Sequence, residues 1–239
     1  MMTMKPKKMT MRHSEGVEVD KEKLKALYAL VARGEGEQLE FKRKATHPEK
    51  IVREMIAFAN SKGGTVLIGV SDDGSIPGVK FPDEELFVVQ RAITRLSRPH
   101  INYEKEIISL STGRYVISLK VLFGKRKPYF LRLSRWRRGC FIRIDDKSIK
   151  ASKEVQQILY LQAKQHDVQF TYGEYEQKLF RHLDKFNYVT VAEFSALCDI
   201  GYHHASNILV QLVLANVLKI EPHEKGDQYA ICRGSLLTI

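Results

Sequence analysis

A run of 38 residues, from Ile107 to Ile144, contains ten arginines and lysines and no aspartate or glutamate. Such a window is uncommon, because about one residue in four is charged in an ordinary globular protein. Cationic side chains bind phosphate oxygens, and aromatic rings between them can stack on bases. The composition therefore favours a nucleic-acid surface over the alternative, a merely solvated face. The predicted nucleic-acid-binding residues are Lys120, Lys125, Arg126, Lys127, Arg132, Arg135, Trp136, Arg137, Arg138 and Arg143.

Strands must position these cations, because alternate side chains of a strand share one face. We expect strands at about Tyr115–Leu122, Tyr129–Leu133 and Cys140–Ile144. The segment Arg135–Arg138 then falls at a hairpin tip. There, Trp136 either stacks on a base or covers the core, and the sequence leaves both open.

Charge divides the chain into two parts. The net charge is +11, but residues 1–169 hold 33 Lys/Arg against 20 Asp/Glu, whereas residues 170–239 hold 6 against 8. We therefore predict a basic flexible tail over residues 1–19, a nucleic-acid-binding domain over residues 20–165 and a small domain over residues 166–239. We expect that removing residues 170–239 leaves a folded domain that still binds nucleic acid non-specifically.

Helical and strand patterns alternate before the basic run, which predicts an α+β fold with a mixed sheet and flanking helices. Beyond the basic run, a closing helix is expected at about Ser152–Gln165. The earlier helices are expected at about residues 20–33, 48–60 and 82–98. The earlier strands are expected at Gln38–Arg43, Thr65–Val70 and Tyr103–Ser109.

The last 70 residues have the order helix, helix, turn, helix, hairpin, which is typical of a winged-helix domain. Thr190 and Glu193 fit a capping box at the start of the second helix. The third helix, about Tyr202–Asn216, contains no lysine or arginine. DNA contact and protein contact, including homodimerisation, therefore both stay open for this domain. The candidate contacts on this helix are Tyr202, His203, His204 and Asn207.

Three motifs lie in a distinctive order: Gln38-Leu39-Glu40-Phe41-Lys42, then Ala57 to Gly64, then Leu67 to Gly74. With Lys127 to Phe130 and Phe141 to Ile144 downstream, the chain resembles the Schlafen AlbA-type family over roughly residues 20–160. The resemblance implies a Schlafen AlbA-type mixed sheet that binds nucleic acid.

The resemblance also implies a nuclease site, because some members of the family cleave structured RNA with three metal-binding carboxylates. Carried onto this chain, these carboxylates are Glu35, Glu40 and Asp72, which would hold Mg²⁺ or Mn²⁺. The first position departs from the family pattern, because Gly36 stands where Ser or Thr is usual, so Glu37 is an alternative ligand.

An inert role for these carboxylates is the competing interpretation. Glu40 can pair with Lys42 or Arg43, and Asp72 can simply shape a turn. If Leu39 and Phe41 face the core, Glu40 faces the opposite, open side of the sheet.

The leading functional hypothesis is a nucleic-acid-binding protein, more specifically a DNA-binding transcriptional regulator. The alternative is a metal-dependent endoribonuclease acting on structured RNA such as tRNA, and a scaffold that recruits a partner is a third hypothesis. Binding requires no cofactor, whereas the nuclease requires Mg²⁺ or Mn²⁺. The sequence has no phosphate-binding G-x-x-x-x-G-K-[ST] loop, no paired cysteine motif and no apolar run long enough to span a membrane, so we expect a cytoplasmic protein.

Overall fold

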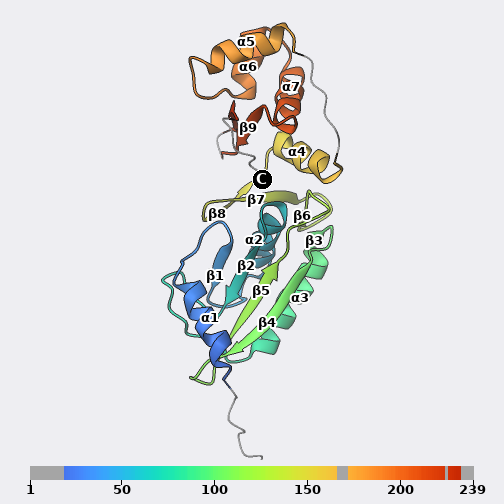
Figure 1. Ribbon diagram of the computed structural model, residues 1–239. Coiled ribbons are helices and arrows are strands. Elements are labelled where there is room, and N and C mark those ends of the chain that lie inside the picture. The colour runs from blue at the N-terminus through green and yellow to red at the C-terminus, as the bar shows by residue number, and fades with distance from the viewer. Residues whose placement is uncertain (1–18, 166–171, 224–225, 233–239) are drawn as a thin grey trace, which may run out of the picture.

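The computed structural model describes residues 19–165, 172–223 and 226–232 (Figure 1). Nearly all of the predicted basic tail, residues 1–18, lies outside the described residues. The same holds for residues 166–171, at which we placed the boundary between the two domains. Within the described residues, no helix combines the length and the apolar character needed to cross a membrane.

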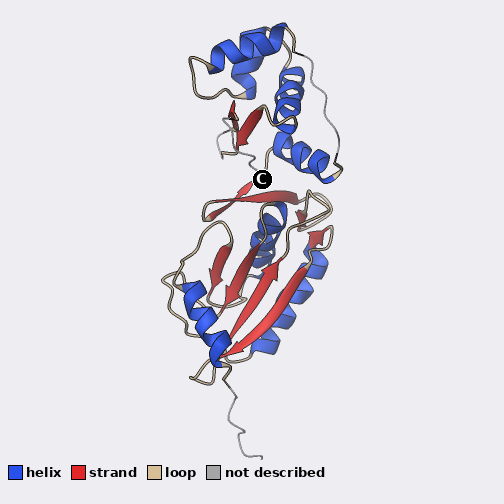
Figure 2. Ribbon diagram, in the orientation of Figure 1, coloured by secondary structure: helices blue, strands red, loops and turns tan. Residues whose placement is uncertain are grey.

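A four-stranded sheet forms the centre of the larger part, with strand order β1-β2-β5-β4 (Figure 2). β1 and β2 run parallel, and the other neighbours are antiparallel, so the predicted mixed sheet is confirmed. The strands are β1 (Leu39–Lys42), β2 (Gly64–Ile68), β4 (Tyr103–Ser109) and β5 (Tyr115–Val121).

Helices cover both faces of this sheet, because its strands alternate apolar side chains between the two sides. Val66 and Ile68 pack with α2 and α3, whereas Leu67 between them packs with α1. The helices are α1 (Lys21–Val31), α2 (Pro48–Asn60) and α3 (Pro82–Leu96). Proline at the first position of α2 and α3 suits a helix start, where its missing N–H needs no partner.

A second four-stranded sheet, with order β3-β6-β7-β8, lies across α2 (Figure 1). We predicted one mixed sheet and did not assign strands to a second one, so this division into two sheets was not expected. The chain leaves the first sheet after β5 at Gly124, whose N–H donates to the carbonyl of Ala59 on α2 at 3.1 Å. The strands are β3 (Ser97–Arg98), β6 (Phe130–Arg132), β7 (Arg138–Ile144) and β8 (Lys147–Lys150).

The C-terminal elements follow the predicted order of three helices and a hairpin. Thr190 and Glu193 form the predicted capping box, and Asp199 ends the second helix in a left-handed conformation (φ 53°). The winged-helix assignment stays a prediction. The elements are α4 (Lys153–Ala163), α5 (Glu174–Leu183), α6 (Val191–Cys198), α7 (Tyr202–Leu214), β9 (Leu218–Glu221) and β10 (Gln228–Ile231).

One apolar core joins the second sheet to the C-terminal elements. Cys140 and Ile142 of β7 belong to the same buried cluster as Ile158 of α4 and Leu209 of α7. Helix α4 contacts α7 directly. The two parts of the chain therefore share α4 and β7 as common packing elements.

Candidate nucleic-acid interface and carboxylate cluster

The turn between β6 and β7 carries four arginines within seven residues, and we call residues 132–138 the arginine hairpin. Its tip is fixed by main-chain hydrogen bonds, because the Leu133 N–H donates to the Arg137 carbonyl at 2.9 Å. The Ser134 hydroxyl accepts from the Arg137 N–H at 3.1 Å. The prediction of a hairpin tip is confirmed for positions 135–137, and Arg138 already begins β7. Four exposed cationic side chains result: Arg132, Arg135, Arg137 and Arg138.

Aromatic rings, rather than carboxylates, accompany these guanidinium groups. The Arg135 guanidinium lies 5.4 Å from the ring centroid of Trp136, and the Arg138 guanidinium lies 5.2 Å from that of Phe130. None of the four arginines forms an ion pair with a carboxylate in the described parts of the chain. Trp136 is 85% exposed, so it does not cover the core. The hairpin therefore presents uncompensated positive charge around one exposed indole ring.

Three other predicted cations are exposed outside the hairpin. Lys125 and Arg126 lie in the loop that joins β5 to β6. Lys120 lies on β5, where its Nζ is 3.5 Å from a carboxylate oxygen of Glu104 on β4. Both side chains of that pair are more than half exposed, so the ion pair leaves Lys120 accessible to a polyanion.

Two of the predicted contact residues, Lys127 and Arg143, are not on this surface. Lys127 is 6% exposed, its Nζ donates to the Ser61 carbonyl at 3.0 Å, and burial lowers its pKa to about 8. The Arg143 side chain is 1% exposed. Their strand and loop positions turn them inward against α2, so neither can reach a phosphate in this arrangement.

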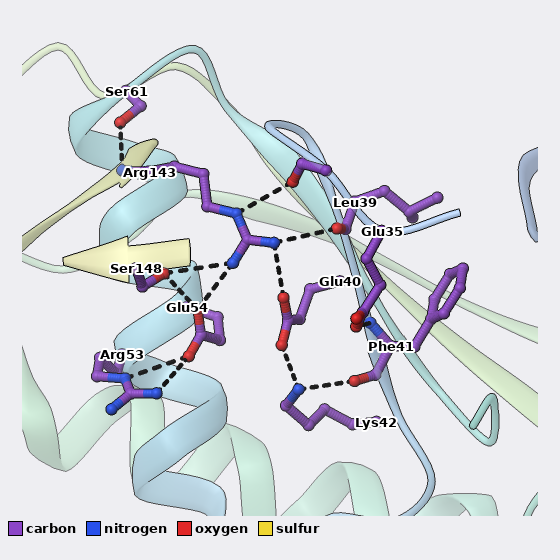
Figure 3. A network of polar contacts seen from close by, with 11 residues as sticks. Glu35, Leu39, Glu40, Phe41, Lys42, Arg53, Glu54, Ser61, Arg143 and Ser148 are labelled. Carbon is purple, nitrogen blue, oxygen red and sulfur yellow. Dashed lines mark hydrogen bonds and ion pairs between the residues drawn. The ribbon is translucent and has the colours of Figure 1, made fainter. Parts of the chain in front are cut away.

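Arg143 is the centre of a buried polar network (Figure 3). Its guanidinium lies between two carboxylates, with Nη2 2.7 Å from Glu40 of β1 and Nη1 3.1 Å from Glu54 of α2. Nε also donates to the Gly36 carbonyl at 3.0 Å. The network ties β1, α2 and β7 together, and a buried charge of this kind is tolerated only with such partners.

We expected Glu40 to face an open side of the sheet, and that expectation was wrong. It is 8% exposed, and the side chain of Arg143 from β7 lies against it. One of its oxygens is bound by Arg143 and the other by Lys42, so the predicted pairing with Lys42 is confirmed. Each oxygen of this carboxylate is already bonded to a cationic nitrogen, which reduces its capacity to bind a metal ion.

Glu35 and Asp72 lie within electrostatic reach of each other. Burial raises the pKa of Glu35, the Phe41 N–H that donates to it at 2.8 Å lowers it, and the charges of Glu40 and Asp72 raise it further. Asp72 itself is exposed. The alternative first ligand, Glu37, is 3.1 Å from the ammonium of Lys62.

No group of three His, Cys, Asp or Glu side chains among the described residues is arranged to hold a metal ion. Glu35, Glu40 and Asp72 therefore do not form such a group in this conformation, although Glu40 and Asp72 both lie near Glu35. Arg143 and Lys42 would compete with a metal ion for Glu40, because each of them already binds one of its oxygens.

The candidate contacts of the C-terminal part lie on the first turns of α7, and all four side chains are exposed. Tyr202 and His203 contact each other edge to face, with ring centroids 6.3 Å apart. His204 packs against Tyr175 of α5 in the same manner, at 5.7 Å. Asn207 lies one turn further along. This face is polar and aromatic, and none of its four candidate residues is a Lys, Arg, Asp or Glu.

Sequence reasoning missed Glu54, which shares Arg143 with Glu40, and the role of Asn60. The Asn60 side chain accepts from the Tyr129 N–H at 2.7 Å and donates to the Phe141 carbonyl at 2.8 Å, so it joins the end of α2 to β6 and β7. The partners lie 69 and 81 positions away in the sequence. A charged residue inside an apolar helix face was the one local signal for Glu54.

Comparison with known proteins supports a family assignment for the segment that contains both four-stranded sheets. Residues 35–152 match the family model described as Schlafen, AlbA_2. The match begins at the first carboxylate, contains the arginine hairpin and ends at the N-cap of α4. It supports the assignment of this segment to the family that its motifs resemble, and it does not extend to the C-terminal elements.

Two solved structures are similar in part. The DIP2311 protein from Corynebacterium diphtheriae is 14% identical, with a TM-score of 0.43, over 88% of this chain and 43% of that protein. The N-terminal domain of a RecG-related protein from Nitrosomonas europaea is 19% identical, with a TM-score of 0.37, over 53% of this chain and 92% of that domain. This chain thus spans less than half of the Corynebacterium protein. No curated protein matches it.

Proposed function

We propose that the segment matching the Schlafen, AlbA_2 model binds nucleic acid, with the arginine hairpin as its principal contact. The observation that carries the proposal is the set of four exposed arginines with no ion pair to a described carboxylate. Guanidinium groups form paired hydrogen bonds with phosphate oxygens and displace condensed counterions from the backbone. Lys125 and Arg126 add positive charge to the preceding loop.

The test is the salt dependence of binding. Replacing Arg135, Arg137 and Arg138 together with alanine should weaken binding to a labelled duplex and reduce the slope of log affinity against log salt by up to about three. Fluorescence anisotropy at several salt concentrations measures both quantities. The matched control replaces three exposed cations on and just after α1, Lys21, Lys25 and Arg33.

The control variant should keep the slope of log affinity against log salt that the unmodified protein has. If the hairpin variant keeps the affinity and slope of the unmodified protein, the contact surface lies elsewhere. If both triple variants lose the same amount, general positive charge rather than the hairpin is responsible.

The more specific form of the proposal is a DNA-binding transcriptional regulator. The support is the order of the C-terminal elements, with the exposed start of α7 in the position of a recognition helix. Selection of bound duplexes from a randomised pool should recover a shared sequence, and His203→Ala with Asn207→Ala should change it. Recovery of no shared sequence would contradict a sequence-specific regulator.

Self-association through the C-terminal part belongs to the same proposal. Its described surface exposes large aromatic side chains, among them Tyr172 and Phe186. Such groups are enriched where proteins meet. Sedimentation of the full chain should show a dimer, which Phe186→Glu should shift toward monomer.

The second candidate is the metal-dependent endoribonuclease, and one observation favours it: the charges of Glu40 and Asp72 both act on Glu35. Incubating tRNA and duplex DNA with the protein and Mg²⁺ or Mn²⁺ tests it. Asp72→Asn is the informative variant, because Asp72 is exposed and its replacement spares the buried network. Cleavage that Asp72→Asn abolishes would favour the nuclease, and an absence of cleavage with intact binding would leave a binding protein.

A further inference from the structure

Trp136 is the one tryptophan in the sequence, and it is the most exposed of the large apolar side chains described. The ring belongs to none of the buried clusters, so it adds nothing to the core. Large aromatic side chains are normally buried, because exposing an apolar ring to water is unfavourable. An indole ring held at a hairpin tip therefore needs an explanation outside the fold.

The backbone around Trp136 is ordered by the hairpin. Its N–H is 3.4 Å from the Ser134 hydroxyl, and the strands on either side are paired from Phe130 with Cys140 to Arg132 with Arg138. Among the residues that the structure describes, Arg135 alone places its cation over the ring, at 5.4 Å from the centroid. The ring is thus presented on a defined turn with one cation beside it.

We propose that Trp136 is a stacking platform for an unpaired nucleobase, so that the hairpin prefers single-stranded or looped nucleic acid to duplex. The proposal rests on the proposed nucleic-acid binding and deepens it. Arginines on both sides of the ring would hold the phosphates that flank the base. A duplex offers this ring no free base face, because its bases are already stacked on one another, whereas an unpaired base offers a whole π-face.

The charge of the hairpin selects this partner over an apolar one. Four arginines surround the ring, and Leu133, at 39% exposed, is the only other large apolar side chain exposed on the hairpin. An apolar protein groove would leave those guanidinium groups without partners, at a desolvation cost. An anionic lipid surface would also be complementary to these positive charges, so the experiment tests it separately.

Intrinsic fluorescence gives a direct readout, because Trp136 is the sole indole in the chain. Titration with oligothymidylate or oligouridylate should quench this fluorescence, and a duplex of equal length should quench it much less. Trp136→Ala should lower the affinity for the single strand by about 5- to 150-fold, the range typical of stacking on an aromatic ring. Its affinity for the duplex should change less than about twofold.

Two further variants separate stacking from other causes. Trp136→Phe keeps an aromatic face and should retain most of the single-strand preference. Phe87→Ala removes another exposed ring, 64% exposed on α3, and should change nothing. Circular dichroism of each variant would test whether the fold is kept.

Equal losses on single strand and duplex in Trp136→Ala would overturn the stacking role while leaving the proposed function standing. Loss of all binding in the triple arginine variant, with Trp136→Ala unchanged, would do the same. Quenching by phosphatidylserine vesicles but by no oligonucleotide would contradict the nucleobase proposal and would indicate a lipid surface as the partner of Trp136. If no nucleic acid binds even the unmodified protein, the proposed function itself fails.

Discussion

Arg143 keeps two carboxylates from different elements apart and neutralised in a space that is almost closed to solvent. The Glu40 and Glu54 side chains are 10% and 5% exposed, and both reach the same guanidinium. The net stabilisation from such a network is small, because desolvation offsets most of the attraction. Breaking it is costly, since a single removed partner leaves charges buried alone.

We predict that Arg143→Met lowers the free energy of unfolding by about 3–5 kcal/mol, because two buried carboxylates then lose their shared cation. Urea unfolding followed by circular dichroism measures the change. Arg53→Ala is the control: Arg53 also pairs with Glu54, but its side chain is 40% exposed. That variant should cost less than about 1 kcal/mol, and equal costs for both variants would contradict the special role of Arg143.

Lys127 makes stability depend on pH in a defined direction. Burial lowers its pKa in the folded protein from 10.5 to about 8, so between these values the unfolded chain holds a proton that the folded chain has lost. The free energy of unfolding should therefore rise with pH across this window, by at most about 1.4 kcal/mol per pH unit from this group.

We expect Lys127→Met to remove this contribution. The difference in unfolding free energy between the unmodified protein and the variant should shift in favour of the unmodified protein as the pH rises from about 8 to 10.5. Lys125→Met is the control, since Lys125 is exposed in the same loop. A difference that stays constant with pH would show that Lys127 is not titrating in that window.

At the scale of elements, Asn60 is the joint between the two sheets. It ends α2, which packs on the first sheet, and its amide bonds the backbones of β6 and β7 in the second. The side chain is fully buried. The arginine hairpin is the extension of these same two strands, so its position on the molecule depends on this joint.

We predict that Asn60→Ala costs about 2–4 kcal/mol of stability, because it leaves several buried peptide groups without partners. Thermal and urea unfolding measure the loss. Asn102→Ala, at an exposed position, should cost less than about 0.5 kcal/mol. A small loss at Asn60 would show that the sheets are joined by apolar packing alone.

The sequence was sufficient to predict most elements, because their apolar periods and caps are local. Strand β8 was missed, since Lys147–Lys150 is short and mostly polar and follows a left-handed turn at Asp145. The division into two sheets was also missed, because it depends on which strands pair across long separations. Of the site, the exposed arginines were predictable from composition, whereas the burial of Arg143 was set by Glu54, 89 positions earlier.

At the scale of the whole molecule, α4 belongs to two packing environments. It follows the segment that matches the family model, yet Val155, Ile158 and Leu159 lie in the core that the C-terminal helices complete. Our prediction that the chain stays folded after removal of residues 170–239 must therefore account for this face of α4. Without the C-terminal part, these three side chains would lose much of their cover.

We predict that a fragment of residues 19–165 binds nucleic acid but melts at a lower temperature than the full chain and binds a hydrophobic dye. A fragment of residues 19–152, which lacks α4, should melt at a still lower temperature, because Cys140, Ile142 and Ile149 of the second sheet then lose their contacts with α4. Calorimetry and dye fluorescence measure both effects. If the longer fragment matches the full chain in melting temperature and dye binding, the shared core contributes little.

The buried ion network also affects when the parts of the domain can pack together during synthesis. Glu54 precedes Arg143 by 89 residues in the chain. At roughly 5–20 residues per second, its cation is made about 4–18 s later. Until then, closing α2 over β1 would bury Glu40 and Glu54 without the cation that they share, which is unfavourable. We therefore expect the first half of the domain to reach its final packing only after β7 has been synthesised.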